Sequence, residues 1–284
     1  MKFAYFPGCK IPFYLQEYGR SFEAVMKKLG VELVKLPFNC CGYPSRSESF
    51  EISILSSIRN LALAEKHGLD LITPCKCCFG QFKQAIYWWN NHAELQNKID
   101  AALKNEGLSW NGKTQIKHLL SFLYYDFGLE DLKQQITRQL PDNKIAVQYG
   151  CHALRPFSIT GFDDPYVPKI FEALVNITGF QTIEWSKSTE CCGNPIYETN
   201  KKLSVKMLHS KLKTASDSGA AYICNACTHC QIQYNYMEME QESKKFNIIP
   251  VLFTQLLGRA MGLSKKELGI TDNHGFNFWR GDFF

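Results

Sequence analysis

The 284-residue sequence lacks the segments that would carry a chain into or across a membrane. Its start, Met1 to Cys9, has no basic opening, no apolar run and none of the small-residue cleavage site of a secretory signal. No stretch approaches the roughly 18 apolar residues that a bilayer-spanning helix needs. We therefore expect a soluble, cytoplasmic protein without a transmembrane segment, which partners could hold at the periphery of a membrane.

The sequence also lacks a concentrated positive charge and any low-complexity tract. Its 32 Lys and Arg residues are interleaved with 27 Asp and Glu residues, for a net charge of +5. Because a nucleic-acid groove needs a basic face, we expect no nucleic-acid partner. With 45% hydrophobic residues the chain can bury a proper core, in one large domain or two of about 140 residues.

Cysteine, in contrast, is abundant, with twelve residues. In the cytoplasm thiols stay reduced, so cysteine-rich patterns there indicate metal binding or catalysis rather than disulfides. The ferredoxin run, with cysteines at every third position, is missing. Electrons would therefore have to arrive from the conventional clusters of a partner.

The sequence contains an internal repeat. Segments 21–30 and 170–179 are apolar at helical spacing and end in Gly, and each precedes a strand-like run, 31–36 or 180–185. A cysteine pair follows in a shared context, CCGYP from Cys40 in one copy and CCGNP from Cys191 in the other. Matched spacing of this kind is not expected of incidental core cysteines.

The repeat extends outward from the cysteine pairs. Upstream, an apolar run delivers a lone cysteine after a glycine, FAYFPGC at Cys9 and IAVQYGC at Cys151. Downstream, a helical stretch at about 50–67 or 200–217 leads to a short apolar run that ends in CxxC. Each cysteine group thus follows a predicted strand, where parallel sheets bind their ligands.

This order predicts an α/β fold of two pseudo-symmetric, Rossmann-like halves. Each half would be a small, mainly parallel sheet flanked by helices. Residues from about 81 to 140 belong to neither shared part and are expected to form a helical insertion. We place the first repeat, with this insertion, at residues 1–142 and the second, with a C-terminal tail, at 143–284.

Each copy supplies five thiols from three separate loops. The first set is Cys9, Cys40, Cys41, Cys75 and Cys78, and the second set is Cys151, Cys191, Cys192, Cys227 and Cys230. Thiolates select zinc, copper(I) or iron–sulfur clusters. Zinc and a cubane [4Fe–4S] cluster each take four ligands, and five thiols exceed that need. The pattern favours iron–sulfur clusters, with zinc in one half as the alternative.

Five further residues lie beside these sets. Cys77 and Cys224 have no counterpart in the opposite copy and are expected to be spare. His152 could donate a proton to a leaving thiolate or make a structural hydrogen bond. Arg155 could hold an anionic substrate group or pair with a buried carboxylate. Lys76, inside the first CxxC, could offset cluster charge or simply be exposed.

The doubled arrangement resembles the cysteine-rich CCG domain family, and within it the B subunit of heterodisulfide reductase. Two CCGxP copies, Cys-His-x-x-Arg at 151–155 and the closing segment from Ile249 to Ile270 carry the resemblance over nearly the whole chain. Both intervals between the cysteine pair and CxxC are slightly short against the family pattern.

The resemblance implies two noncubane [4Fe–4S] clusters, one bound by the five cysteines of each set. It also implies reductive cleavage, or formation, of a disulfide or related sulfur substrate between facing clusters, with each product sulfur captured at an iron. The implied partners are the iron–sulfur C subunit and the flavin-bearing A subunit of such a complex.

Two other functions stay open. CCG proteins also resemble electron-transfer and membrane-anchoring subunits of some succinate dehydrogenases and fumarate reductases. The apolar stretch 246–263 and the aromatic residues Phe276, Phe278, Trp279, Phe283 and Phe284 would then touch lipid, although Pro250 makes a buried strand at least as good a reading. A zinc-bound scaffold without a redox role is the third possibility.

Overall fold

Two four-stranded, all-parallel sheets form the frame of the molecule. The computed structural model describes residues 1–140, 142–239 and 246–270. The first sheet has the order β2-β1-β3-β4 and the second the matching order β6-β5-β7-β8. The strands are β1 Lys2–Tyr5, β2 Glu32–Val34, β3 Leu71–Thr73, β4 Ile116–His118, β5 Lys144–Gln148, β6 Gln181–Ile183, β7 Tyr222–Asn225 and β8 Ile249–Leu252. The predicted pair of pseudo-symmetric α/β halves is confirmed.

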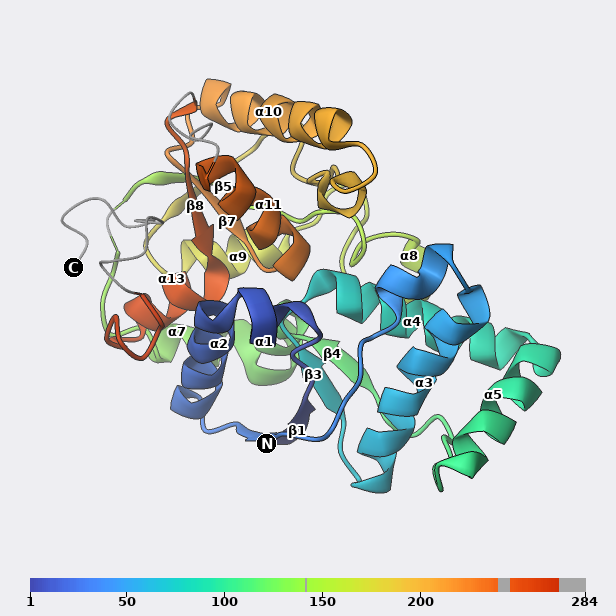
Figure 1. Ribbon diagram of the computed structural model, residues 1–284. Helices are drawn as coiled ribbons and strands as arrows, with labels where there is room; N and C mark the ends of the chain where they lie inside the picture. Colours follow the sequence, from blue (N-terminus) through green and yellow to red (C-terminus); the bar gives the residue numbers. More distant parts are fainter. Residues whose placement is uncertain (141, 240–245, 271–284) are drawn as a thin grey trace.

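Helices connect the strands and cover the sheets (Figure 1). The first half contains α1 Lys10–Tyr14, α2 Gln16–Lys28, η1 Tyr43–Ser47, α3 Phe50–Lys66, α4 Lys76–Asn91, α5 Ala93–Asn105, α6 Leu119–Ser121, the π-helical η2 Phe122–Gly128 and α7 Leu129–Gln134. The second half contains α8 Phe157–Thr160, α9 Ile170–Asn176, η3 Asn194–Ile196, α10 Lys201–Asp217, α11 Thr228–Met239 and α13 Phe253–Ala260.

The long crossover helices α3 and α10 both begin with a side-chain N-cap. Ser49 accepts a hydrogen bond from the Ile52 N–H at the start of α3, and Asn200 accepts one from Leu203 at the start of α10. Such caps satisfy one of the amide groups that a helix start leaves unpaired. The middle strands β3 and β7 are buried along their whole length, because both faces of a parallel sheet are covered.

The structure differs from the sequence expectation at residues 116–118. The sequence places this segment in the helical insertion, but it forms β4, which pairs in parallel with β3 at Leu71↔Ile116. Its counterpart is β8, which pairs with β7 in the same way. A three-residue run before a helix carries too little periodicity to distinguish a strand from a helix start. The helices found within the expected insertion are the end of α4, then α5, α6, η2 and α7.

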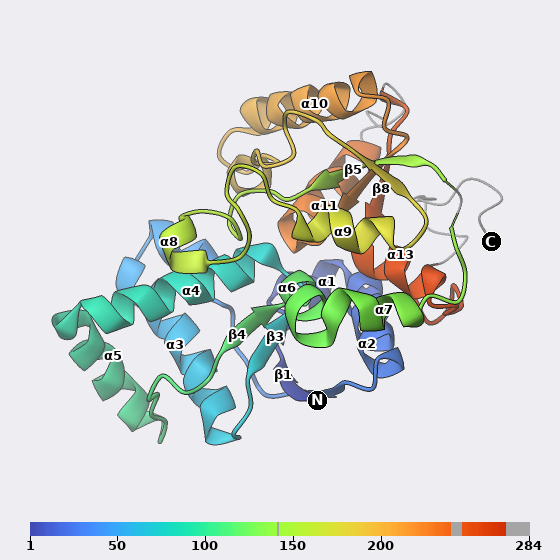
Figure 2. The same cartoon turned by 180° about the vertical axis from the view of Figure 1, so that it is seen from behind.

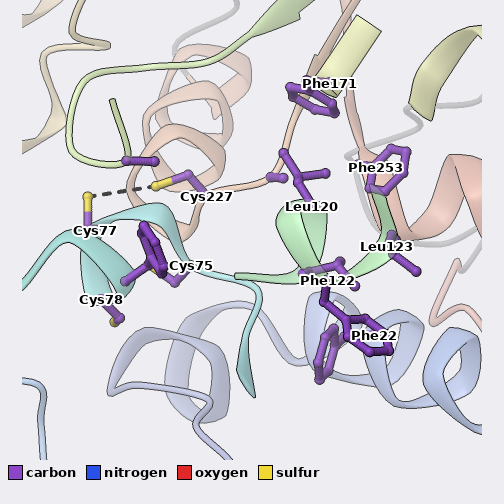
Figure 3. Close-up of a cluster of buried hydrophobic side chains, with 14 of the residues drawn as sticks. Phe22, Cys75, Cys77, Cys78, Leu120, Phe122, Leu123, Phe171, Cys227 and Phe253 are labelled. Carbon is purple, nitrogen blue, oxygen red and sulfur yellow. Dashed lines mark hydrogen bonds between the residues drawn. The ribbon is translucent and has the colours of Figure 1, made fainter. Parts of the chain in front are cut away.

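The two halves share one hydrophobic core. Helix α13 of the second half packs against α2 of the first, as both ribbon views show (Figures 1 and 2). A hydrogen bond of 2.7 Å links the Oγ of Ser21 in α2 to the Oγ1 of Thr254 in α13. Phe22, Phe171 and Phe253 lie in the same buried cluster (Figure 3). Because side chains of both halves fill this core, the boundary at residue 142 stays a prediction.

The closing apolar stretch lies inside the protein. Strand β8 and helix α13 contribute Val251, Phe253 and Leu257 to the core, each almost fully buried. In the described part of the chain, no helix is both long enough and apolar enough to cross a bilayer. The aromatic residues Phe276, Phe278, Trp279, Phe283 and Phe284 lie outside the described residues.

Candidate metal centre

Every predicted cysteine ligand lies beyond the carboxyl end of a parallel strand. In the first half, β1 leads to Cys9, β2 to Cys40 and Cys41, and β3 to Cys75 and Cys78. In the second half, β5, β6 and β7 lead in the same order to Cys151, to Cys191 and Cys192, and to Cys227 and Cys230. The carboxyl ends of parallel strands share one edge of a sheet, so three distant segments meet in each half.

The five thiols of the first set form a continuous series. The Sγ atoms of Cys9 and Cys40 lie 3.8 Å apart. Cys41 then contacts the thiols of both Cys40 and Cys78, and Cys78 contacts Cys75. All five predicted ligands of the first set are thereby brought together.

The second set repeats the series position by position. Cys191 contacts the thiols of Cys151 and Cys192, and Cys230 contacts those of Cys192 and Cys227. Hydrogen bonds from neighbouring thiols lower the pKa of Cys41 in the first series and the pKa values of Cys191 and Cys227 in the second. The thiolate is the metal-binding form of cysteine, and in each set this form is favoured at one cysteine of the adjacent pair.

The two sets meet in the middle of the molecule. The Cys227 thiol contacts Cys75, its counterpart in the other half, and lies 3.7 Å from the Sγ of Cys77. Figure 3 shows Cys77 pointing from α4 toward Cys227 across the boundary between the halves. Cys75 and Cys227 therefore mark where the pseudo-symmetric sets adjoin.

A left-handed glycine turns the chain after each cysteine pair. Gly42 and Gly193 both have φ of +89°, a backbone conformation that side chains with a Cβ rarely adopt. A Cβ on Gly42 would collide with the backbone oxygen of Ser53, and one on Gly193 would lie 2.8 Å from that of Ser204. The glycine therefore allows the loop of each cysteine pair to pack closely against the long helix that follows it, α3 or α10.

The donor set fits a thiolate-bound cluster. All five cysteines of the second set line one small cavity. Within the described ranges, no three His, Cys, Asp or Glu side chains surround a single point as the ligands of one metal ion would. Soft thiolates spread in series along a cavity wall are suited to an iron–sulfur core that presents several irons.

A cleft of about 520 Å³ opens between the two CCG loops. Tyr43 and Arg46 of η1 line one side, Asn194 and Tyr197 the other, and Lys10 also contributes. Pro195 and His229 line both this cleft and the cavity of the second set, so the cleft leads from the surface toward the thiols. We refer to it as the inter-loop cleft.

His152 lies at the junction of the two sets. Its Nδ1 atom is 3.2 Å from the Sγ of Cys151 and 3.4 Å from that of Cys77. Tyr43 packs edge-on against its ring at 4.7 Å. Burial lowers the pKa of His152, so its neutral form is favoured in this position.

The other residues singled out from the sequence have clear positions. Lys76 is buried, with 2% exposure, and its Nζ donates to the backbone oxygen of Gln148 at 2.9 Å. The reading of an exposed Lys76 is therefore wrong. Arg155 is exposed and donates to the backbone oxygen of Thr189. Cys224 lies within β7 in the core and is not a member of the series of contacts that joins each set.

Sequence reasoning missed several residues of the site. Cys77, expected to be spare, adjoins Cys227 and His152. Tyr43 and Arg46, directly after the first CCG, could have been noticed from that position. Lys10 directly follows Cys9, and His229 lies between Cys227 and Cys230. Nothing in the sequence indicated that the side chains of Lys10 and His229 would line the same cleft.

Comparisons with known proteins agree with this geometry. The sequence profile of the family described as "Cysteine-rich domain" (CCG) matches residues 3–83 and 145–235. The chain is 32% identical to the B subunit of the ferredoxin/F420H2-dependent CoB-CoM heterodisulfide reductase of Methanosarcina acetivorans, over 96% of this chain and 93% of that protein. It is 33% identical to the 8-methylmenaquinol:fumarate reductase membrane anchor subunit of Wolinella succinogenes, over 96% of both chains.

One solved structure has the same fold. The crystal structure of a hypothetical protein from Helicobacter pylori superimposes with a TM-score of 0.72 on 97% of this chain, at 19% sequence identity. The present chain spans 52% of that longer chain. At this identity the likeness shows the fold alone.

The glycine after the first cysteine pair should be irreplaceable. Gly42→Ala introduces both a left-handed alanine and a collision with Ser53, and we expect it to lower the free energy of unfolding by about 3 kcal/mol or more. Gly68→Ala is the control, since Gly68 has φ of +65° but open space around it, and should cost about 1 kcal/mol. Urea unfolding measures both, and equal losses would contradict the role of the collision.

Proposed function

The chain belongs to the cysteine-rich (CCG) domain family, and from that membership we propose that it is the iron–sulfur redox subunit of a heterodisulfide reductase-like complex. It would reduce, or in the reverse direction form, a disulfide or related sulfur substrate. The observation that carries the proposal is the pair of equivalent five-thiol sets that adjoin at Cys75 and Cys227. Breaking one S–S bond takes two electrons and two protons and releases two thiols, which suits two adjoining one-electron centres.

Each set would hold one noncubane [4Fe–4S] cluster through its five thiolates. The ligands are Cys9, Cys40, Cys41, Cys75 and Cys78 for one cluster and Cys151, Cys191, Cys192, Cys227 and Cys230 for the other. When bound, such clusters supply electrons one at a time. The chain's own contribution is to bury the thiols, to hold them in series and to admit substrate through the inter-loop cleft.

The inter-loop cleft favours a substrate with an anionic group. Lys10 and Arg46 supply two cationic side chains, whereas Glu198 is the one acidic residue of its lining. The phenol of Tyr43 stays protonated, because burial and the nearby thiolates raise its pKa, and it can donate a hydrogen bond. A carboxylate, sulfonate or phosphate on the substrate would be held here while its sulfur points toward the cysteines.

His152 is our candidate for the residue that delivers a proton to a product thiolate. It faces Cys77 and Cys151 from the junction of the sets, and its neutral ring keeps one N–H to donate. The same contacts would also support a purely structural role, and the turnover of a His152→Ala variant distinguishes the two roles.

Electrons would come from two partner proteins. The chain has no ferredoxin-type cysteine run, so we propose that an iron–sulfur partner, the C subunit, delivers electrons that a flavin-bearing partner, the A subunit, provides. The twelve cysteines, all within the described residues, form no disulfide. Reduced thiols in this number fit a reducing compartment, and we propose that the complex works in the cytoplasm.

A second candidate function has support from one relative. The similarity to a fumarate reductase membrane anchor subunit favours an electron-transfer and anchoring role, in which electrons pass between a quinone and a partner. Release of thiols from a small anionic disulfide by the reduced, isolated chain would favour the first candidate. Flotation of the isolated chain with lipid vesicles, without such thiol release, would favour the second.

The two-cluster proposal predicts about eight irons and matching acid-labile sulfide in each anaerobically prepared chain. Cys9→Ser and Cys151→Ser should each lose about half of this content, because each disrupts one set. Cys224→Ala, which removes a thiol from β7, should retain all of it. Fewer than about four irons in the unmodified chain, with zinc in their place, would contradict the proposal.

The cleft charges predict a defect in substrate use. Arg46→Gln removes one cation that faces the cleft and should lower kcat/KM for an anionic disulfide about tenfold, equivalent to roughly 1.4 kcal/mol. Arg20→Gln is the matched control, because Arg20 is exposed on α2 and does not line the cleft. Equal activity of both variants with anionic and neutral disulfides would argue against charge recognition.

Loss of the proposed proton donor should slow the reaction itself. His152→Ala is expected to reduce kcat about 100-fold while iron content stays near that of the unmodified chain. His67→Ala, a change at an exposed histidine after α3, should leave kcat unaltered. Unchanged turnover of His152→Ala would remove the proton-donor role and leave the structural one.

A further inference from the structure

The two cysteine sets match, but the side chains behind them do not. The helices α3 and α10 correspond residue by residue, since Gln81 donates to Ser53 Oγ and Gln233 to Ser204 Oγ, both at 2.9 Å. Seven residues further along these helices, the first half has Asn60 and the second half has Lys211. A neutral amide and a cationic side chain therefore occupy equivalent positions.

Asn60 holds the loop of the first cysteine pair through neutral hydrogen bonds. Its Nδ2 donates to the backbone oxygen of Cys40 at 3.1 Å, and its Oδ1 accepts from the Asn39 N–H at 3.1 Å. These contacts satisfy the buried amide without adding charge. The first cluster would thus have a polar but uncharged residue behind its cysteine pair.

Lys211 is a fully buried lysine on the equivalent side of the second set. Its Nζ donates to the backbone oxygen of Lys187 and lies 4.9 Å from the centre of the Trp185 ring. Burial lowers the pKa of Lys211 to about 8, against the opposing influence of Cys230 and Cys192. The ammonium therefore remains the main form at neutral pH.

The residues directly after Cys75 and Cys227 also differ between the halves. The residue after Cys75 is Lys76, and the residue after Cys227 is Thr228. Lys76 reaches across to the second half, where its Nζ contacts Gln148 O and lies 4.4 Å from the centre of the Phe171 ring. Thr228 instead brings a neutral hydroxyl to 3.0 Å from the Sγ of Cys75.

Other charged groups do not cancel this difference. Glu172 opposes the charge of Lys76, whereas the equivalent Glu23 of the first half is paired with Lys35 at 2.9 Å, so Lys76 is not counted toward the difference. Lys187 is already paired with Glu190 at 2.9 Å. Lys10 is next to Cys9, but it is half-buried and lines the inter-loop cleft, where water weakens its influence.

We propose that Lys211 makes the cluster of the second set the easier of the two to reduce. A buried positive charge stabilises the more negative, reduced form of a nearby cluster. Electrons would then enter at the first set and collect at the second, next to the cavity that the inter-loop cleft reaches. This inference rests on the proposed function, and Lys211 is a positioning residue in it.

The test is a redox titration of the two-cluster chain, followed by low-temperature electron paramagnetic resonance. Cys9→Ser and Cys151→Ser assign each signal to a set. Lys211→Met should lower the potential of the second cluster by at least a tenfold change in its one-electron equilibrium, or about 59 mV, and leave the first cluster unshifted. Lys211→Gln is the second neutral variant and keeps a donor for Lys187 O.

Two control variants separate charge from packing. Lys211→Arg keeps the charge and should preserve both potentials, and Lys213→Met removes an exposed lysine of the same helix and should do likewise. If both neutral Lys211 variants carry normal iron and unshifted potentials, or bind no cluster in the second set while Lys211→Arg does, the inference is wrong. Fewer than about four irons in the unmodified chain would instead overturn the proposed function, and this inference with it.

Discussion

The meeting of ten thiols depends on one constraint, the parallel direction of all eight strands. In each half the carboxyl ends of three neighbouring strands share an edge, so loops that are 30 or more residues apart in the sequence deliver their cysteines to one place. The common core between α2, α9 and α13 then fixes the two halves so that Cys75 and Cys227 adjoin. Neither set would reach the other if the halves were joined only by a loose linker.

Polar groups around the thiols show how this concentration of buried sulfur is tolerated. Burying a charge without a partner is costly, so each series contains thiols that donate to a neighbouring thiolate. The buried amines of Lys76 and Lys211 find backbone oxygens and aromatic faces. Because both amines lie beside the second set, the two pseudo-symmetric thiol sets have different polar surroundings.

Much of the fold could be read from the repeat, because matched spacing shows which segments correspond. Both long crossover helices begin within a residue of the expected positions, and the strands before the cysteines are where the apolar runs placed them. The strand β4 escaped detection because three residues, Ile116–His118, carry no decisive periodicity. The place of Cys77 in the site could not be predicted, because the other copy has no cysteine at the equivalent position. Its spatial neighbour Cys227 is also 150 residues away in the sequence.

The sequence by itself determined which residues are the candidate ligands, since residue type and spacing alone single out two equal sets of five soft thiols. The tertiary structure alone decided that the two sets adjoin, that a cleft with Lys10 and Arg46 leads to one of them, and that Lys76 of the first half lies against the second. The physical reason is that contacts between the halves depend on how two sheets and their helices pack. Packing is set by the shapes of many side chains together, and no local pattern in the sequence records it.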